Sequence, residues 1–215
     1  MIVGASRYAN SQSSEGAFYV YHGSASGISS TPISIVESNN ANAEMGASVA
    51  SAGDVNGDGY SDVIVGAPGY SNGEVGEGAI FLFNGSASGI NTTPVNTIES
   101  NQVNAFFGYS VACSGDINAD GYSDVAVIFN RYSNGETNEG ATFLYSGSST
   151  GINTIPIAIL ETNQASANLS SVASAGDVNG DGYSDIIAGA NNYSNGQSGD
   201  CLLYTSPSPR DGLLS

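Results

Sequence analysis

The feature that most constrains the fold is an internal repeat of about 62 residues. The string "DVNGDGYSD" at residues 54–62 returns as "DINADGYSD" at 116–124 and as "DVNGDGYSD" at 177–185. The segment after each loop also recurs, because "VIVGAPGYSNGE" from Val63 aligns with "MIVGASRYANSQ" from Met1 and "VAVIFNRYSNGE" from Val125. Self-similarity at a fixed period predicts a repeat architecture in which copies of one unit stack on each other.

Each unit contains four runs of strand length. In the first complete copy they are "SVASAG", "DVIVGA", "GAIFLFN" and "PVNTIES", which start at Ser48, Asp62, Gly78 and Pro94. Clusters of Gly, Asn and Ser separate them, and none has a 3.6-residue period long enough for a helix. Four strands in a unit of this length are typical of one propeller blade. The sequence therefore predicts an all-β fold, a β-propeller fragment of four-stranded antiparallel blades.

Composition limits the partners and the chemistry. The net charge is −17, with 3 Arg, no Lys and 20 acidic residues, which argues against nucleic acid and anionic membrane. No apolar run approaches the roughly 18 residues of a membrane span, so we expect no membrane insertion. With one histidine and two cysteines, no nucleophile and base can be assembled outside the acidic loops. We therefore expect no enzyme activity.

The repeated acidic loop has the oxygen donors that calcium prefers. Ca²⁺ takes six to eight oxygen ligands, and alternating side chains at loop positions 1, 3 and 5 can converge on one point. The carbonyl of position 7 and the carboxylate of position 9 can complete the shell. An EF-hand would instead need an acid at position 12, where Val65 stands in a predicted strand. The alternative is an acidic hairpin without a metal. The predicted ligands of about three structural calcium sites are Asp54, Asn56, Asp58, Tyr60 and Asp62; Asp116, Asn118, Asp120, Tyr122 and Asp124; and Asp177, Asn179, Asp181, Tyr183 and Asp185.

Two further motifs flank the acidic loops. "FG" stands at Phe107-Gly108 and "GAP" at Gly66-Ala67-Pro68, with the calcium loop between them in repeat order. With these motifs, residues 1–200 resemble the FG-GAP repeat family, the blades of the integrin alpha-subunit propeller and of many bacterial surface proteins. Other copies depart from the motifs, with Met45-Gly46 and "ANLSS" at 167–171 for the FG segment.

The resemblance implies a ring that commonly has seven blades, of which this chain holds about three to three and a half. We expect a partial blade at residues 1–42, blades at 43–104 and 105–166, and a truncated blade at 167–200. Residues 201–215, "CLLYTSPSPRDGLLS", resemble the translation of a sequencing adapter. We expect this tail to be non-native, and its "CLLY" to imitate strand pairing at an open edge.

A recurring "YSNGE" turn follows the second strand of each unit. In a meandering blade this turn and the calcium loop lie on opposite faces. In integrins the ligand binds on the face away from the calcium loops, so the resemblance makes this the binding face. A local ion pair of either Arg with Glu15, Glu136 or Glu139 is the alternative to a ligand contact. The candidate ligand-face residues are Arg7, Tyr8, Tyr70, Asn72, Arg131, Tyr132 and Asn134.

Together these patterns predict a non-catalytic, calcium-binding propeller module for extracellular adhesion or protein recognition. Its expected partners are an extracellular protein and the remaining blades of the same propeller. Two alternatives stay open: a lectin-like propeller with a glycan ligand, and a scaffold domain of a larger secreted enzyme.

Overall fold

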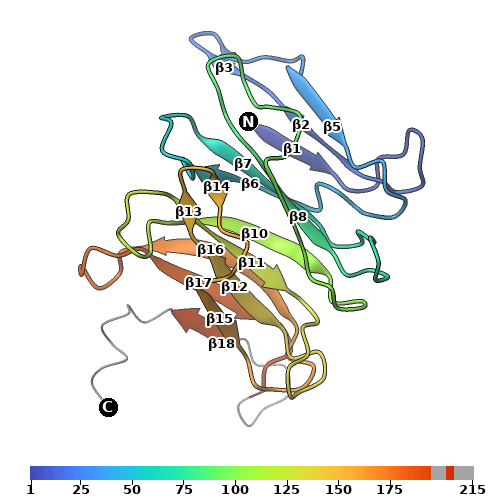
Figure 1. The fold of residues 1–215 in the computed structure, drawn as a ribbon, viewed down its shortest axis with the longest axis vertical. Helices are drawn as coiled ribbons and strands as arrows, with labels where there is room; N and C mark the ends of the chain where they lie inside the picture. The colour runs from blue at the N-terminus through green and yellow to red at the C-terminus, as the bar shows by residue number, and fades with distance from the viewer. Residues whose placement is uncertain (195–201, 206–215) are drawn as a thin grey trace.

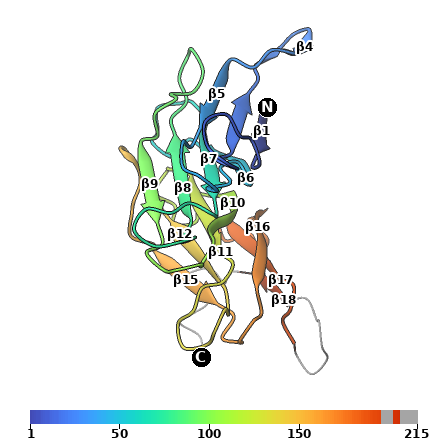
Figure 2. The same cartoon turned by 90° about the vertical axis from the view of Figure 1, so that its right-hand side faces the viewer.

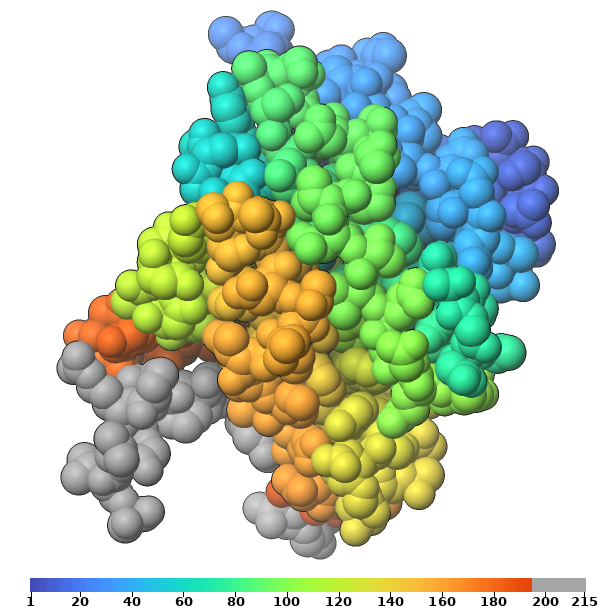
Figure 3. All heavy atoms as spheres, in the orientation of Figure 1, coloured from blue at the N-terminus to red at the C-terminus, as the bar shows by residue number. Residues whose placement is uncertain are grey.

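The computed structural model describes residues 1–194 and 202–205, the latter by their backbone. This part of the chain consists of strands and their connections, and it contains no helix that could span a membrane. Figure 1 shows the sheets following one another along the long axis, and Figure 3 shows the N-terminal segments (blue) at the upper right and the last described segments (dark orange) at the lower left. Such a linear stack is what tandem structural units produce.

Two central sheets have four antiparallel strands each, paired in sequence order. The first contains β6 (Ser48–Gly53), β7 (Asp62–Ala67), β8 (Ala79–Phe83) and β9 (Asn96–Glu99). The second contains β10 (Phe107–Gly115), β11 (Asp124–Phe129), β12 (Ala141–Tyr145) and β15 (Ala158–Glu161). The prediction of four-stranded antiparallel units is confirmed.

The two outer sheets of the stack have three described strands each. The first contains β1 (Ile2–Ala5), β2 (Ala17–Val20) and β5 (Ser34–Glu37), and β1 takes the place that β7 has in the next copy. The last contains β16 (Leu169–Gly176), β17 (Asp185–Ala190) and β18 (Leu202–Thr205). The backbone of β18, from the segment expected to be a non-native tail, pairs with β17. The remainder of that expected tail lies outside the described residues.

Two short hairpins extend the turns between the third and fourth strands of a unit. They are β3 (Gly23–Ser24) with β4 (Gly27–Ile28), and β13 (Gly147–Ser148) with β14 (Gly151–Ile152). The first hairpin is exposed, whereas most of the second is buried.

The hydrophobic core lies between neighbouring sheets. Every residue of β7, β8, β11 and β12 is buried, because both faces of each central sheet are covered. Alternate residues serve different interfaces: Val63 and Val65 pack against Phe18 of the preceding sheet, whereas Ile64 packs with Phe107 of the following one. Figures 1 and 2 both show the β6–β9 sheet between its two neighbours.

The FG and GAP glycines meet across a sheet interface. A Cβ built on Gly66 would lie 2.0 Å from the carbonyl oxygen of Gly108, and Gly4 stands in the same relation to Gly46. Gly108 has φ +79°, a conformation that glycine adopts without a Cβ clash. At the next sheet interface both motifs change together. Ile128 replaces Gly66 and is buried in one cluster with Leu169, the residue in the place of Phe107.

Candidate functional site

The three acidic loops lie at one edge of the stack of sheets. Each connects the first and second strands of its unit, β6 to β7, β10 to β11 and β16 to β17. Figure 1 shows these loops on the left, whereas the turns between β7 and β8 and between β11 and β12 lie on the right. The meander therefore places the acidic loops and the "YSNGE" turns on opposite faces.

The first Asp of each loop accepts hydrogen bonds from the backbone that follows it. Asp54 Oδ1 accepts from the amides of Gly57 and Asp58 at 2.8 and 3.1 Å, and Oδ2 accepts from Gly59 at 2.8 Å. Asp177 makes the three corresponding bonds in its own loop, and Asp116 makes two of them, from the amides of Asp120 and Gly121. These carboxylates therefore close the tight turn by satisfying backbone donors.

The middle of each loop is held by an Asn and an Asp. Asn56 Nδ2 donates to Asp58 Oδ2 at 2.9 Å, and the Asp58 amide donates back to Asn56 Oδ1 at 2.9 Å. The same pairing occurs at residues 118 and 120 and at 179 and 181. Ala119 has φ +60°, where the other two loops have glycine at φ +74° and +75°, so this Ala carries local backbone strain.

The last Asp of the loop is buried and joins two parts of its unit. Asp62 accepts hydrogen bonds from the amides of Val55 at 3.0 Å and Gly85 at 2.8 Å. Asp124 accepts from Ile117 and Gly147 in the same way. Burial raises the pKa of Asp62, and it raises the pKa of Asp124 to about 6, against the opposing effect of the amide hydrogen bonds.

The donor chemistry of the loops fits a hard cation, whereas the arrangement of the acids is closed on the backbone. Within the described residues, no group of three or more His, Cys, Asp and Glu side chains comes together to hold a metal ion. The reason is that the carboxylates turn toward the loop amides. Each carboxylate oxygen has two lone pairs, so an oxygen that accepts one amide, such as Asp54 Oδ2, keeps acceptor capacity for a cation, whereas Asp54 Oδ1 already accepts two. Calcium ligation by these residues stays a prediction.

On the opposite face, the tyrosines pack into their own units. The Tyr70 ring lies 5.5 Å from the Phe81 ring, and Tyr132 lies 5.2 and 5.3 Å from Phe129 and Phe143, in edge-to-face arrangements. Tyr8 contacts the neighbouring Tyr19 ring in the same way, at 6.4 Å. These contacts account for the recurrence of the tyrosine without a ligand.

The candidate asparagines are hydrogen-bonded within their units. Asn72 Nδ2 donates to both carboxylate oxygens of Glu99 at 3.0 and 3.1 Å, and Asn134 Nδ2 donates to Glu161 at 2.8 Å. Each bond joins the "YSNGE" turn to the fourth strand of its unit. The Asn side chains therefore stabilise the turn, and a ligand contact would compete with these bonds.

The two candidate arginines are exposed. The Arg131 guanidinium carbon lies 4.8 Å from the centroid of the Phe106 ring, a cation–π contact. Among the residues that the structure describes, neither Arg7 nor Arg131 forms an ion pair with Glu15, Glu136 or Glu139. Glu15 and Glu139 are buried, and their carboxylates accept from turn amides. The side chains therefore do not form the local ion pairs that were the alternative to a ligand contact.

Sequence reasoning considered Glu15 and Glu139 only as ion-pair partners, and it missed that each turn holds a buried Glu that accepts hydrogen bonds from backbone amides. Glu77 accepts from the amides of Asn72 at 2.7 Å and Asn101 at 3.2 Å. Glu15 accepts from three amides of residues 10–12, and the bond from Asn10 is the main reason that the pKa of Glu15 is lowered. The recurring string "EGA" at residues 15–17 and 77–79, with "EGA" again at 139–141, was the available signal.

A second missed contact joins neighbouring sheets. Gln102 lies in the link between two units, and its side-chain amide bonds twice to the backbone of Ser133 in the next turn, at 3.0 and 3.2 Å. Gln164 repeats this with Ser194 at 2.6 and 2.8 Å, and Asn40 donates once to Ser71. We call this contact the amide clamp.

Four-stranded meanders stacked face to face, with a recurring hairpin loop at one edge of each unit, define the blades of a β-propeller. The chain belongs to the FG-GAP repeat family: residues 45–83 match the FG-GAP repeat, and residues 116–188 match the FG-GAP-like repeat. The predicted family and fold class are confirmed.

Several curated proteins are similar to this chain. Integrin alpha-V of Gallus gallus is 37% identical over 160 residues, which are 69% of this chain and 15% of that protein. Integrin alpha-6 of Homo sapiens is 42% identical over 83 residues, 39% of this chain and 7% of that protein. A phosphatidylinositol-glycan-specific phospholipase D of Bos taurus is 33% identical over 147 residues, 64% of this chain and 17% of that protein. The chain thus spans less than a fifth of the length of these relatives.

Proposed function

We propose that this chain is part of a calcium-stabilised extracellular propeller that recognises a protein ligand in adhesion. The observation that carries the proposal is the 37% identity to an integrin alpha subunit over 160 residues, a stretch longer than two of the repeats of about 62 residues. Arg7 and Arg131 are exposed on the face away from the acidic loops, which supports that face as the ligand-binding face.

Calcium would have a structural role in this proposal. The loops offer Asp and Asn side-chain oxygens at the spacing that a hard cation takes, and two of the three Asp in each loop are close to the surface. Each loop joins the first two strands of one blade, so a bound ion would hold that hairpin together. Because each loop connects two strands that pair with each other, we do not expect calcium binding to cause the large opening motion of a calcium sensor.

Thermal unfolding with and without calcium tests this role. A cation that binds only the folded chain should raise its stability, by about 2.7 kcal/mol per site at a concentration of roughly 100 times the Kd. We expect EDTA to lower the Tm and millimolar calcium to restore it, with less effect from magnesium at matched ionic strength. Asp58→Asn should reduce the calcium response, whereas Glu74→Gln, an exposed carboxylate on the other face, should not. An identical Tm in EDTA and calcium would refute the role.

Ligand recognition needs a separate test. The full chain, labelled and kept in calcium, can be applied to an array of purified extracellular-matrix proteins and an array of glycans. We expect saturable binding to protein spots, weakened when Arg7 and Arg131 are both replaced by Ala. Binding to glycans alone would favour the lectin-like alternative. Protein binding that both substitutions leave unchanged would contradict the assignment of this face as the ligand-binding face.

The similarity to a phospholipase D favours one further candidate, a scaffold domain within a larger secreted enzyme. The catalytic residues would then belong to other parts of the polypeptide. Sequencing the coding region on both sides of this chain distinguishes the two: adjoining adhesion-type domains support the main proposal, and an adjoining hydrolase domain supports the scaffold.

A further inference from the structure

Six Asn-Gly pairs occur in the sequence, and the structure places five of them in different surroundings. The backbone nitrogen of a Gly can attack the side-chain carbon Cγ of the Asn before it, because a residue without a Cβ allows the close approach. The attack closes a five-membered succinimide ring, and it requires that the Gly amide lose its proton. A pair is therefore reactive where its Gly amide is unbonded and exposed to water. The five described pairs are 56–57, 72–73, 84–85, 134–135 and 179–180, and the sixth, 195–196, lies outside the described residues.

Two pairs lie in acidic loops, where a carboxylate holds the Gly amide. The Gly57 amide donates to Asp54 Oδ1 at 2.8 Å, and the Gly180 amide donates to Asp177 Oδ1 at 2.7 Å. A carboxylate at this distance opposes loss of the amide proton, because the nitrogen would become a second anion beside it. We expect these two pairs to be protected.

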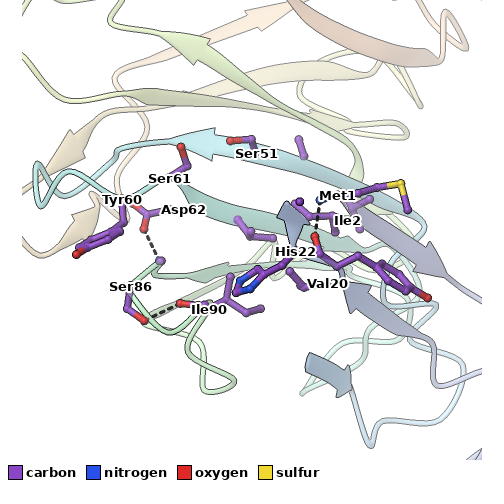
Figure 4. A pocket seen from close by; sticks show the side chains of 17 residues that line it. Met1, Ile2, Val20, His22, Ser51, Tyr60, Ser61, Asp62, Ser86 and Ile90 are labelled. Atoms are coloured by element: carbon purple, nitrogen blue, oxygen red, sulfur yellow. Dashed lines mark hydrogen bonds between the residues drawn. The ribbon is translucent and has the colours of Figure 1, made fainter. Parts of the chain in front are cut away.

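The pair at 84–85 is protected by burial as well as by a carboxylate. Gly85 is buried, and its amide donates to Asp62 at 2.8 Å. Figure 4 shows Asp62 extending toward the turn that contains Ser86, with a dashed line for this bond. Water, which must open the succinimide ring, has little access to a buried pair.

The remaining two pairs, 72–73 and 134–135, lie in "YSNGE" turns on the face away from the acidic loops. All four residues are exposed. Among the described residues, no hydrogen bond is made by the amide of Gly73 or of Gly135. A Cβ built on either glycine would meet nothing within 4 Å, so the backbone has open space around it. Each nitrogen can therefore lose its proton to water and approach the Asn side chain.

We propose that Asn72 and Asn134 are modification sites at which the chain deamidates without an enzyme. The nitrogen of the following Gly forms a bond to the Asn Cγ, and the bond from Cγ to Nδ2 breaks. The proton that the Gly nitrogen loses is matched by the one that the leaving NH₂ group gains as it departs as ammonia. Water then cleaves one of the two C–N bonds of the ring, which gives aspartate or isoaspartate. In total, one carboxamide and one water become one carboxyl group and one ammonia.

The product cannot keep the contacts that hold the turn. Asn72 Nδ2 donates to both carboxylate oxygens of Glu99, and Asn134 Nδ2 donates to Glu161. An aspartate side chain has no donor and brings a second negative charge against the same carboxylate. Deamidation should therefore release each turn from the fourth strand of its blade. The bonds are at the surface, where water competes for them, so they delay the ring closure without preventing it.

The test incubates the full chain in mildly alkaline water enriched in oxygen-18 and maps its peptides by mass spectrometry. Each conversion introduces one oxygen-18 atom, which distinguishes it from deamidation that occurred during preparation. Conversion at Asn72 and Asn134 should be roughly 10- to 100-fold faster than at Asn56 and Asn179, the factor for breaking one hydrogen bond to a charged group.

Two controls separate the effect of the fold from that of the local sequence. Asn10 has the same place in the first turn, but Ser11 follows it and the Ser11 amide donates to Glu15 at 3.0 Å, so Asn10 should remain unconverted. In urea the structural differences disappear, and all the Asn-Gly pairs should convert at similar rates. Equal conversion of Asn56 and Asn72 in the folded chain, or a difference that persists in urea, would overturn the inference.

Amide hydrogen exchange tests the release of the turn. Asn72→Asp, which has the charge of the product, should speed exchange at the amides of Asn72 and Gly76 by roughly 2- to 10-fold, the factor for one surface hydrogen bond. The double variant Asn72→Asp/Glu99→Gln places a donor opposite the new carboxylate and should return exchange to the parent rate. Unchanged exchange in Asn72→Asp, or no recovery in the double variant, would show that deamidation leaves the turn in place.

Discussion

At the scale of single residues, charged groups inside the turns organise this protein. Glu77 is fully buried in a turn rich in Gly, Ser and Asn, where an acid would be expected at the surface. Its two carboxylate oxygens satisfy two backbone amides, one in its own turn and one in the link to the next blade. The turn therefore depends on an acceptor pair that glutamine supplies only in part.

The variant Glu77→Gln should destabilise the chain by about 1–3 kcal/mol, because its amide NH₂ must face one of the two backbone N–H groups. Glu139→Gln is the matched control. Glu139 Oε2 accepts no hydrogen bond from the described residues, so an NH₂ at that position displaces no bond and the loss should be smaller. Urea unfolding of both variants measures the difference. Equal losses would show that the second amide contributes nothing.

At the scale of elements, the contact between successive blades is made by backbone as much as by side chains. Gly66 of β7 and Gly108 of β10 let two sheets approach closely, and the amide clamp of Gln102 joins the link between the two units to the turn of the second unit. Neither contact belongs to a single repeat. The stability of a blade therefore depends on its neighbour, as expected of a linear array.

The variant Gly66→Ala should be strongly destabilising, by about 3 kcal/mol or more, at the upper end of the penalties for overpacking. Its Cβ would lie 2.0 Å from a backbone oxygen that cannot rotate away. Gly23→Ala is the control, because a Cβ at Gly23 meets nothing within 4 Å, and it should change stability by no more than about 0.5 kcal/mol. The denaturant midpoints of the two variants measure this difference. Similar midpoints would mean that the two sheets can move apart at Gly66 without a loss in the free energy of unfolding.

At the scale of the whole molecule, the excess of acid is the main electrostatic feature. A net charge of −17 opposes compaction, and two of the buried carboxyls have raised pKa values. For such groups the folded state binds protons more tightly than the unfolded state, whose ordinary value is 3.8. Stability should therefore increase as the pH falls through about 6 and decrease as it rises.

The metal-free chain in EDTA should accordingly have a higher Tm near pH 5 than near pH 7. The main single contributor should be Asp124, whose pKa is raised to about 6 by burial. Asp124→Asn removes that titration and should flatten the dependence of Tm on pH, even though it also lowers stability at each pH. Glu74→Gln makes the same change of charge at an exposed site and should leave the slope close to that of the parent. A Tm that falls on acidification would contradict this reasoning.

The repeat period and strand patterns were enough to predict the blades and the opposite placement of loops and turns. What they missed depends on neighbours in space. Tyr70 and Tyr132 were candidate ligand-face residues, and the sequence did not show that each ring packs on a Phe ring of the adjacent strand. Gln102 carries no motif of its own, since its role depends on a serine 31 residues further along the chain. A sequence pattern within one repeat does not contain such contacts.

The paired change of the FG and GAP positions has a consequence for how such arrays can be rearranged. One interface between sheets has Gly66 and Gly108 at these two positions, whereas the next has Ile128 and Ser170, with Ile128 buried in one cluster with Leu169. If the blade with Ile128 were followed by one that begins with Phe107-Gly108, a branched side chain would meet a backbone oxygen at clashing distance. The copies are therefore not interchangeable. Recombination that reorders them must keep the matched residues of each sheet interface together, so these interfaces restrict which blade can follow which.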